Sequence, residues 1–373
     1  MNIIPAQIGC QIDDIDTPAL VLDLDAFDRN MQKMASFAQA TGIGLRPHAK
    51  THRCPVIAMK QLALGAMGQC CQKVGEAEVL VRGGVKNILV SNQIIDRQKL
   101  RRLAALAKEA EISLCFDAVE QVDRASEAAA EFGVELGGRV EIDLGMRRCG
   151  IASVPAAADL ALYIASKPNL KFCGLQAYHG AAQHMSGYEA REKAIGTAAA
   201  LVQSVIDAIK NKGLSCEVVG GAGTGTYHFE GGTGVWNELQ VGSYIFMDAE
   251  YRNIIAKDGG PFRDFEHSLF VLSTVMSTAA TGRVVVDAGL KSYTAEKGYP
   301  LVHGKEGVQV ISVSDEHGCL ELDANAETLN LGDKVFLIPG HCDPTVNLHD
   351  WYIGVRNGRV EALWPIMARG ASS

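Results

Sequence analysis

The sequence lacks long apolar runs, an excess of basic residues and a recognisable leader. No uninterrupted apolar stretch reaches about 18 residues, the length that a helix needs to cross a membrane, so no membrane span is expected. The 35 Lys and Arg residues are outnumbered by 43 Asp and Glu residues, and the formal net charge is -8. A nucleic-acid-binding face, which needs clustered basic residues, is therefore not predicted. The first ten residues hold no charged segment followed by an apolar core, so we predict no signal peptide.

Cysteine is present, but it forms no disulfide pattern. The ten cysteines are scattered, and Cys70 and Cys71 are adjacent. We interpret them as reduced, mostly buried thiols and expect a cytoplasmic protein. With 47% hydrophobic and 21% charged residues, the 373-residue chain is globular, and its length fits a large barrel plus a smaller domain.

Short apolar runs alternate with helical patterns from Asp16 onward. Several runs have no polar face, which is typical of buried parallel strands. Asp25 and Asp96 are expected to cap helices, and Pro55 suits a first helical turn. Eight strand-helix units predict an α/β fold with a (β/α)8 TIM-type barrel. The expected strands are residues 19–24, 45–48, 68–72, 87–91, 113–117, 140–144, 172–177 and 217–221.

The pattern changes after Asp248, where strand-like runs follow one another with hardly any helical periodicity. This change predicts a second, β-rich C-terminal domain. We expect the barrel at residues 16–248 and the second domain at residues 249–373, with residues 1–15 as candidates for pairing with the latter. The expected strands of the second domain are residues 269–275, 283–287, 307–313, 334–339 and 351–355.

Lys50 lies in a segment rich in cationic side chains. Positive neighbours lower the pKa of a lysine, and a neutral lysine is a nucleophile. The sequence therefore favours Lys50 as a reactive amine, although a solvated basic turn is the plain alternative. The neighbours are Arg46, His48, His52 and Arg53.

A glycine-rich loop, residues 220–225, follows the last expected barrel strand. Functional groups of such barrels lie where strands end, and phosphate is commonly held by the last loops. Gly223 and Gly225 allow close approach of an anion to the backbone, and the Thr224 hydroxyl adds a donor. A tight turn without a ligand is the alternative.

Four more side chains end or follow expected barrel strands, so they are candidates for the same end of the barrel as Lys50 and the glycine-rich loop. Arg148 offers a permanent positive charge for a cofactor ring nitrogen, or a surface ion pair. Tyr178 could line a pocket or belong to the core, and His184 could be an ordinary loop histidine. Gln72 ends the third expected strand.

The segment His341-Cys342-Asp343 is a candidate metal site. Residues i and i+2 of an extended segment point the same way, and an imidazole with a carboxylate suits Mn²⁺ or Mg²⁺. Two ligands do not complete a coordination shell, so water or substrate must add the rest. A polar turn is the alternative, and Cys342 and His349 are weaker candidate ligands.

These motifs together resemble the D-threonine aldolase and 3-hydroxy-D-aspartate aldolase family, metal-activated members of the alanine-racemase-like, fold type III pyridoxal phosphate enzymes. The resemblance covers nearly the whole chain. Its blocks are Asp16-Thr17-Pro18, residues 46–50, 70–74, 174–178 and 223–225, Gly242-Ser243-Tyr244, and residues 286–291, 315–318 and 339–345.

The resemblance implies a role for each matching residue. Lys50 would hold pyridoxal 5'-phosphate covalently, and Arg148 would face the ring nitrogen. His184 would lie near the substrate hydroxyl. Other expected cofactor contacts are Gln72, Tyr178, Gly223, Thr224, Gly225, Gly242 and Ser243, and the expected metal ligands are His341 and Asp343.

The resemblance also implies a lyase that cleaves D-3-hydroxy amino acids to glycine and an aldehyde, and it implies a homodimer. The D-serine and 3-hydroxyaspartate dehydratases of the same fold resemble this chain as well, so elimination is an alternative reaction. The D-serine enzymes carry His-x-Cys with zinc where this chain has His341 and Asp343, so cleavage is favoured over elimination. A non-catalytic pyridoxal phosphate-binding protein is a third hypothesis. Among the substrates, 3-hydroxy-D-aspartate would need a cation for its second carboxylate, and D-threonine would not. The candidate cations are Arg46, Arg53, Arg252 and Lys291.

Overall fold

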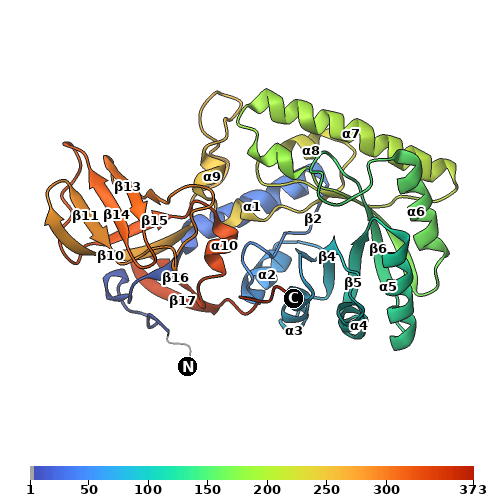
Figure 1. Cartoon of the computed structure of the whole chain (residues 1–373), viewed down its shortest axis with the longest axis horizontal. Helices are drawn as coiled ribbons and strands as arrows, with labels where there is room; N and C mark the ends of the chain where they lie inside the picture. Colours follow the sequence, from blue (N-terminus) through green and yellow to red (C-terminus); the bar gives the residue numbers. More distant parts are fainter. Residues whose placement is uncertain (1–3) are drawn as a thin grey trace.

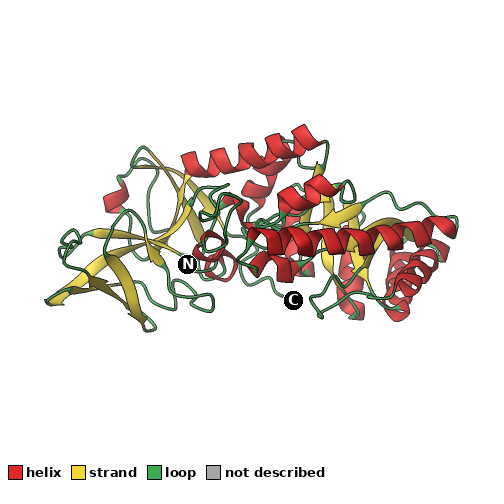
Figure 2. Cartoon of the chain, turned by 90° about the horizontal axis from the view of Figure 1, so that it is seen from above, coloured by secondary structure: helices red, strands yellow, loops and turns green. Residues whose placement is uncertain are grey.

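The computed structural model describes residues 4–373 and contains two β-sheets. In Figure 1 the parallel sheet with its helices lies on the right and the mixed sheet on the left, with α1 running between them. Helices surround the parallel sheet, whereas few cover the mixed sheet, as Figure 2 shows. No helix within residues 4–373 is long and apolar enough to cross a membrane.

The predicted barrel is confirmed, with eight parallel strands in the order β2-β9-β8-β7-β6-β5-β4-β3. A parallel bridge between His48 and Cys70 links the two ends of this order, because it joins the segment after β2 to β3. The strands are β2 (Gly44–Leu45), β3 (Gln69–Cys71), β4 (Asn87–Gln93), β5 (Glu111–Phe116), β6 (Leu136–Glu141), β7 (Leu170–Ala177), β8 (Val219–Gly221) and β9 (Glu238–Leu239).

The first and last strands of the barrel differ from those expected. The apolar run at residues 19–24 predicts the first barrel strand, but β1 (Ala19–Asp23) lies in the other sheet, between β10 and β16. A buried apolar run has the same pattern in either setting, so periodicity does not separate them. The expected eighth strand is β8, the seventh of the barrel, and β9 has only two residues and no pattern of its own.

Helices follow the barrel strands as the alternation predicts. Pro55 occupies the first turn of α2, and Asp96 caps α4 by accepting the Lys99 amide at 2.9 Å, as expected. The cap of α1, however, is Asp23 and not Asp25. The helices are α1 (Leu24–Thr41), α2 (Pro55–Ala63), α3 (Val74–Arg82), α4 (Arg97–Leu106), α5 (Val119–Phe132), α6 (Val154–Ser166), α7 (Tyr188–Asn211) and α8 (Tyr227–Thr233), with 3-10 turns η1 (Ile12–Asp14), η2 (Gly180–His184) and η3 (Ser243–Ile245).

The second sheet has nine strands and contains all five runs expected in the C-terminal part. The N-terminal segment pairs with it, since Gln11 bridges to Arg359 and the Gly9 amide donates to the Val360 carbonyl at 2.8 Å. The domain boundary at residue 248 stays a prediction. Beside β1, the strands are β10 (Leu269–Ala280), β11 (Arg283–Val286), β12 (Leu301–Val302), β13 (Val308–Val313), β14 (Gly318–Leu322), β15 (Lys334–Ile338), β16 (Trp351–Arg356) and β17 (Arg359–Pro365), with the short helices α9 (Ala249–Arg252) and α10 (Cys342–Val346) between strands.

The barrel interior contains a buried charge cluster. Glu238 of β9 accepts two hydrogen bonds from Arg139, at 2.6 and 2.9 Å, and one from Arg46 at 2.8 Å. Burial alone would raise the pKa of Glu238, but the two guanidinium groups outweigh burial and hold its pKa at about 2. This cluster therefore depends on a carboxylate that stays charged.

Replacing this carboxylate should destabilise the fold. Glu238→Gln leaves two buried guanidinium groups without their counter-charge, and we expect the free energy of unfolding to fall by about 3–5 kcal/mol. Urea denaturation followed by circular dichroism measures the change. The control, Glu316→Gln, breaks an exposed pair with Lys291 and should leave stability almost unchanged. Equal effects of the two substitutions would contradict the importance of the cluster.

Candidate active site

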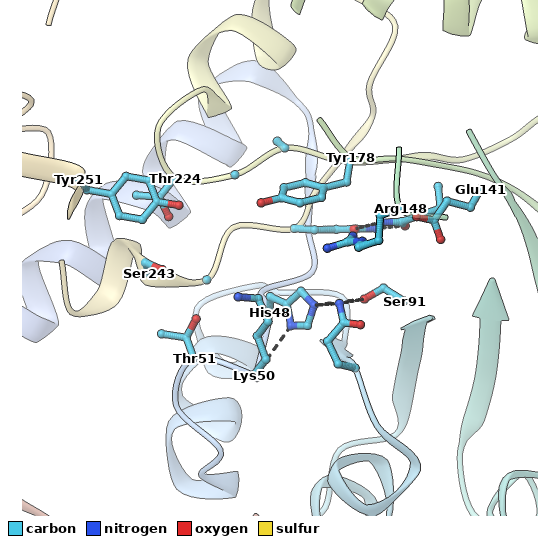
Figure 3. Close-up of a pocket in the computed structure, with 16 residues that line it drawn as sticks. His48, Lys50, Thr51, Ser91, Glu141, Arg148, Tyr178, Thr224, Ser243 and Tyr251 are labelled. Atoms are coloured by element: carbon cyan, nitrogen blue, oxygen red, sulfur yellow. Dashed lines mark hydrogen bonds between the residues drawn. The ribbon is translucent and has the colours of Figure 1, made fainter. Parts of the chain in front are cut away.

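A pocket opens at the carboxyl edge of the barrel, and most of the expected rim residues line it. Figure 3 shows Thr224, Ser243 and Tyr251 at one end, Arg148 and Glu141 at the other, and Lys50 and Tyr178 between them. The two ends of the pocket therefore carry different groups, with hydroxyls at one end and a guanidinium beside a carboxyl group at the other. Its lining residues are His48, Lys50, Thr51, Gln72, Ser91, Glu141, Arg148, Gln176, Tyr178, Ala222, Gly223, Thr224, Gln240, Gly242, Ser243 and Tyr251.

Lys50 is paired with an acidic side chain from α10, the short helix between β15 and β16. Its Nζ donates to Asp343 Oδ2, and 39% of the Lys50 side chain stays exposed. Burial would lower the pKa of Lys50, but the Asp343 carboxylate outweighs burial, so this pKa lies above its ordinary value. The predicted lowering of the Lys50 pKa is therefore wrong for this structure.

The side chains that are close to Lys50 in sequence were expected to lower its pKa, but they either pair with carboxylates or carry no charge. Arg46 points into the barrel and binds Glu238, and Arg53 lies 3.4 Å from Glu76. His48 is buried, and burial first and the Lys50 charge second keep its pKa well below the usual range, so it is neutral.

One end of the pocket is suited to an anion. The Thr224 hydroxyl is buried there without a hydrogen-bond partner among the described residues. Gly223, Gly242 and Ser243 line the same end, as expected. Gly225 differs, because its amide donates to Gln183 Oε1 at 3.0 Å and so is engaged with the protein itself.

The opposite end carries the Arg148 guanidinium, from the loop after β6, beside Glu141 at the end of that strand. Asp143 accepts the amides of Gly145 and Arg147 at 2.9 and 3.1 Å, and Asp117 accepts that of Gly150 at 2.9 Å. These bonds fix the loop that carries Arg148 into the pocket. The only sequence signal for these two carboxylates is their position after barrel strands.

The second sheet contributes the segment that was predicted to bind metal. His341 is extended, but Asp343 lies in the first turn of α10, so the expected extended His-x-Asp geometry is wrong. Burial would raise the pKa of Asp343, yet Lys50 and then His341 outweigh it and hold this pKa at about 2. Asp343 Oδ1 is buried and has no hydrogen-bond partner within the described residues.

His341 and His184 are each held by a glutamate. His341 Nδ1 lies 2.7 Å from Glu296 Oε1, and His184 Nδ1 lies 2.6 Å from Glu250 Oε1. His184 follows β7 as expected, but it lies outside the set of residues that line the described pocket, and its side chain is 52% exposed. No group of three or more His, Cys, Asp or Glu side chains in residues 4–373 is arranged to hold a metal ion.

Sequence reasoning missed several lining residues. Gln176 and Gln240 exchange hydrogen bonds at 2.7 and 2.9 Å below the rim, and Ser91 lies 3.1 Å from His48 Nε2. Ser91 ends the predicted strand 87–91, and Gln176 is next to last in the predicted strand 172–177, so both had a usable signal. Tyr251 had none, since it enters from α9, after the barrel pattern has ended.

Comparisons with known proteins agree with this arrangement. The chain is 47% identical to the 3-hydroxy-D-aspartate aldolase of Paracoccus denitrificans (strain Pd 1222), over 98% of this chain and 95% of the relative. It is 44% identical to the D-threonine aldolase of Arthrobacter sp, over 99% and 96% of the two chains. The chain belongs to the 3-hydroxy-D-aspartate and D-threonine aldolase family.

Further similarities place this aldolase family among alanine-racemase-like proteins. The family model for the alanine racemase N-terminal domain matches residues 22–250, and one for a serine dehydratase domain matches residues 268–355. The crystal structure of D-threonine aldolase from Filomicrobium marinum superposes with a TM-score of 0.96 at 46% identity, over 99% of this chain and 100% of that chain. The expected family, lyase class and fold are thereby confirmed.

The pocket fits pyridoxal 5'-phosphate, the cofactor that this family implies. A phosphate would meet the unpartnered Thr224 hydroxyl, and the ring would extend toward Arg148. Lys50 lies between these ends, where an amine can reach the cofactor aldehyde. The anion-binding end, the amine and the cation thus follow one another in the order in which they would meet the phosphate, the aldehyde and the ring nitrogen of the cofactor.

Removal of the amine should prevent covalent retention of the cofactor. We expect Lys50→Ala to lose the visible absorbance of protein-bound cofactor after dialysis, because no other lysine lines the described pocket. Absorption spectra, and mass spectrometry after borohydride reduction, measure this loss. Lys86→Ala, at an exposed position at the edge of the barrel, is the control and should keep the absorbance. A Lys50→Ala protein with an unchanged spectrum would refute the assignment.

Proposed function

We propose that the protein cleaves the Cα–Cβ bond of D-3-hydroxy amino acids and releases glycine and an aldehyde. The observation that carries the proposal is the contact between Lys50 and Asp343. It brings the candidate cofactor-binding amine of the barrel next to the candidate metal ligand of the second sheet. An activated alcohol and an electron-accepting cofactor are the two elements that this cleavage requires.

The proposal assigns a task to each end of the pocket. Lys50 would hold the cofactor, which supplies an electron sink for the bond that breaks. Thr224 and Ser243 would bind its phosphate. Arg148 would face the ring nitrogen, and because a guanidinium does not readily release its proton, that nitrogen would stay unprotonated.

We propose His341 and Asp343 as ligands of a divalent ion, Mn²⁺ or Mg²⁺. Asp343 Oδ1 is buried and unpartnered within the described residues, and a carboxylate oxygen suits both ions. Glu296 holds His341 Nδ1, which leaves Nε2 as the ligand atom, an arrangement typical of metal-binding histidines. When bound, the ion would lower the pKa of the substrate alcohol.

Elimination of water and ammonia is the second candidate reaction, because residues 268–355 match the serine dehydratase domain model. The metal segment favours cleavage. Asp343 stands where the resemblance implies Cys in D-serine dehydratases, and a hard carboxylate suits Mn²⁺ or Mg²⁺ better than a soft thiolate does.

The two candidate substrates, 3-hydroxy-D-aspartate and D-threonine, differ by a carboxylate in the side chain. Three of the four candidate cations for that carboxylate are engaged elsewhere, and one of them is Arg53, which lies 3.4 Å from Glu76. Arg46 is buried on Glu238, and Lys291 pairs with Glu316 on an exposed surface. The expected homodimer and cytoplasmic location stay predictions.

Product analysis separates cleavage from elimination. With D-threonine or 3-hydroxy-D-aspartate as substrate, we expect glycine and acetaldehyde or glyoxylate in equal amounts. Chromatography of amino acids and a coupled aldehyde assay measure these products. The L-enantiomers are the matched controls and should not react. Ammonia with a 2-oxo acid, and no glycine, would establish the dehydratase reaction instead.

Metal removal should separate catalysis from cofactor retention. We expect EDTA to stop cleavage while the visible absorbance of the bound cofactor remains, because Lys50 and not the metal holds the cofactor. Added Mn²⁺ should restore the rate. Asp343→Asn should weaken Mn²⁺ binding in isothermal titration, since a carboxylate ligand is lost. Full cleavage in EDTA would refute the metal role.

A further inference from the structure

A cluster of polar side chains joins the barrel to the loops of the second sheet. Glu250 Oε1 is 2.6 Å from His184 Nδ1 and 2.9 Å from Lys297 Nζ. The histidine comes from η2 of the barrel, and the lysine comes from the loop after β11. Glu250 itself lies on α9 and is only 20% exposed. One carboxylate oxygen thus serves two donors from different parts of the chain.

The helix that carries Glu250 is fixed to the candidate metal segment. The amides of Ala249 and Glu250 donate to the carbonyls of Pro339 and Gly340, at 3.1 and 3.3 Å. Asp248, which is fully buried, accepts the Cys342 amide at 3.1 Å. Glu250 therefore has a defined position relative to the loop that contains His341 and Asp343.

His184, in contrast, has little support of its own. Its side chain is 52% exposed, and the side-chain contact that positions it among the described residues is the 2.6 Å approach of Nδ1 to Glu250 Oε1. A carboxylate oxygen this close to Nδ1 favours the tautomer with its proton on Nδ1, which leaves Nε2 free to accept a proton. A carboxylate that orients a histidine in this way fixes both its tautomer and its ring direction.

We propose that Glu250 is a positioning residue for His184. By accepting Nδ1–H from a helix fixed to the metal segment, it directs Nε2 toward the substrate 3-hydroxyl held at that segment. This inference rests on the proposed function and adds a residue that no sequence pattern indicated. Lys297 lies 2.9 Å from the same oxygen of Glu250 and helps to hold the carboxylate in place.

A double-mutant cycle tests the proposal. The variants are Glu250→Leu, Glu250→Gln, His184→Ala and the double variant His184→Ala/Glu250→Leu. We expect Glu250→Leu to lower kcat by roughly 10- to 100-fold, with KM and cofactor absorbance nearly unchanged. Because the two residues act as a unit, the double variant should be no slower than His184→Ala. Glu250→Gln keeps an acceptor for Nδ1–H and should recover most of the lost rate.

The matched control is Glu316→Leu, which removes an equal charge from an exposed pair and should leave kcat unchanged. Multiplicative effects of the two single substitutions would overturn the proposal, as would a His184→Ala variant with the full rate. If the Glu250→Leu variant lost its cofactor, the Glu250→Gln variant would test the inference instead. A kcat of Glu250→Gln no higher than that of His184→Ala would overturn it. These outcomes concern only the role of Glu250, because the unmodified enzyme would still release glycine. If the unmodified enzyme released no glycine, the proposed function itself would have failed.

Discussion

The contact between Lys50 and Asp343 is the constraint on which the site depends. Lys50 follows β2 of the barrel, and Asp343 lies on α10, between β15 and β16 of the second sheet, so neither part of the chain holds the site alone. The two sheets are joined by β1, which pairs with β10 and β16 and then leads directly into α1 beside the barrel. A displacement of one sheet would separate the amine from the carboxylate. The docking of the sheets is therefore a condition for the chemistry as well as for stability.

Buried charges in this protein are compensated by partners that are distant in sequence. Arg46 lies four residues before Lys50, yet it binds Glu238 inside the barrel. Lys50 itself is compensated by Asp343, 293 residues away. Since an unpaired buried charge is costly, such pairs fix which way each side chain points. Sequence proximity therefore predicts the wrong sign for the pKa shift of Lys50, and the pairing in space predicts the right one.

The sequence predicts most of the helices and strands but not all of them. Periodicity predicts the barrel, its helices and five strands of the second sheet, because burial on one or both faces leaves a regular pattern. It misassigns β1, whose apolar residues suit either sheet, and it misses β9, which has two residues. The spacing of His341 and Asp343 also predicts an extended metal segment where α10 begins. These failures share one cause, since a short segment has too few residues for its pattern to show which element or which sheet it belongs to.

The sequence by itself determined the fold class, the family and the residue types at the rim, because local patterns and motif order record them directly. Lys50, Thr224 and Arg148 are all identifiable as candidates from their places after apolar runs and from the motifs around them. Only the tertiary structure decided which charged groups meet, namely Asp343 with Lys50 and Glu250 with His184. The physical reason is that electrostatic energy depends on distances in space, and these are set by the packing of two sheets and not by spacing along the chain.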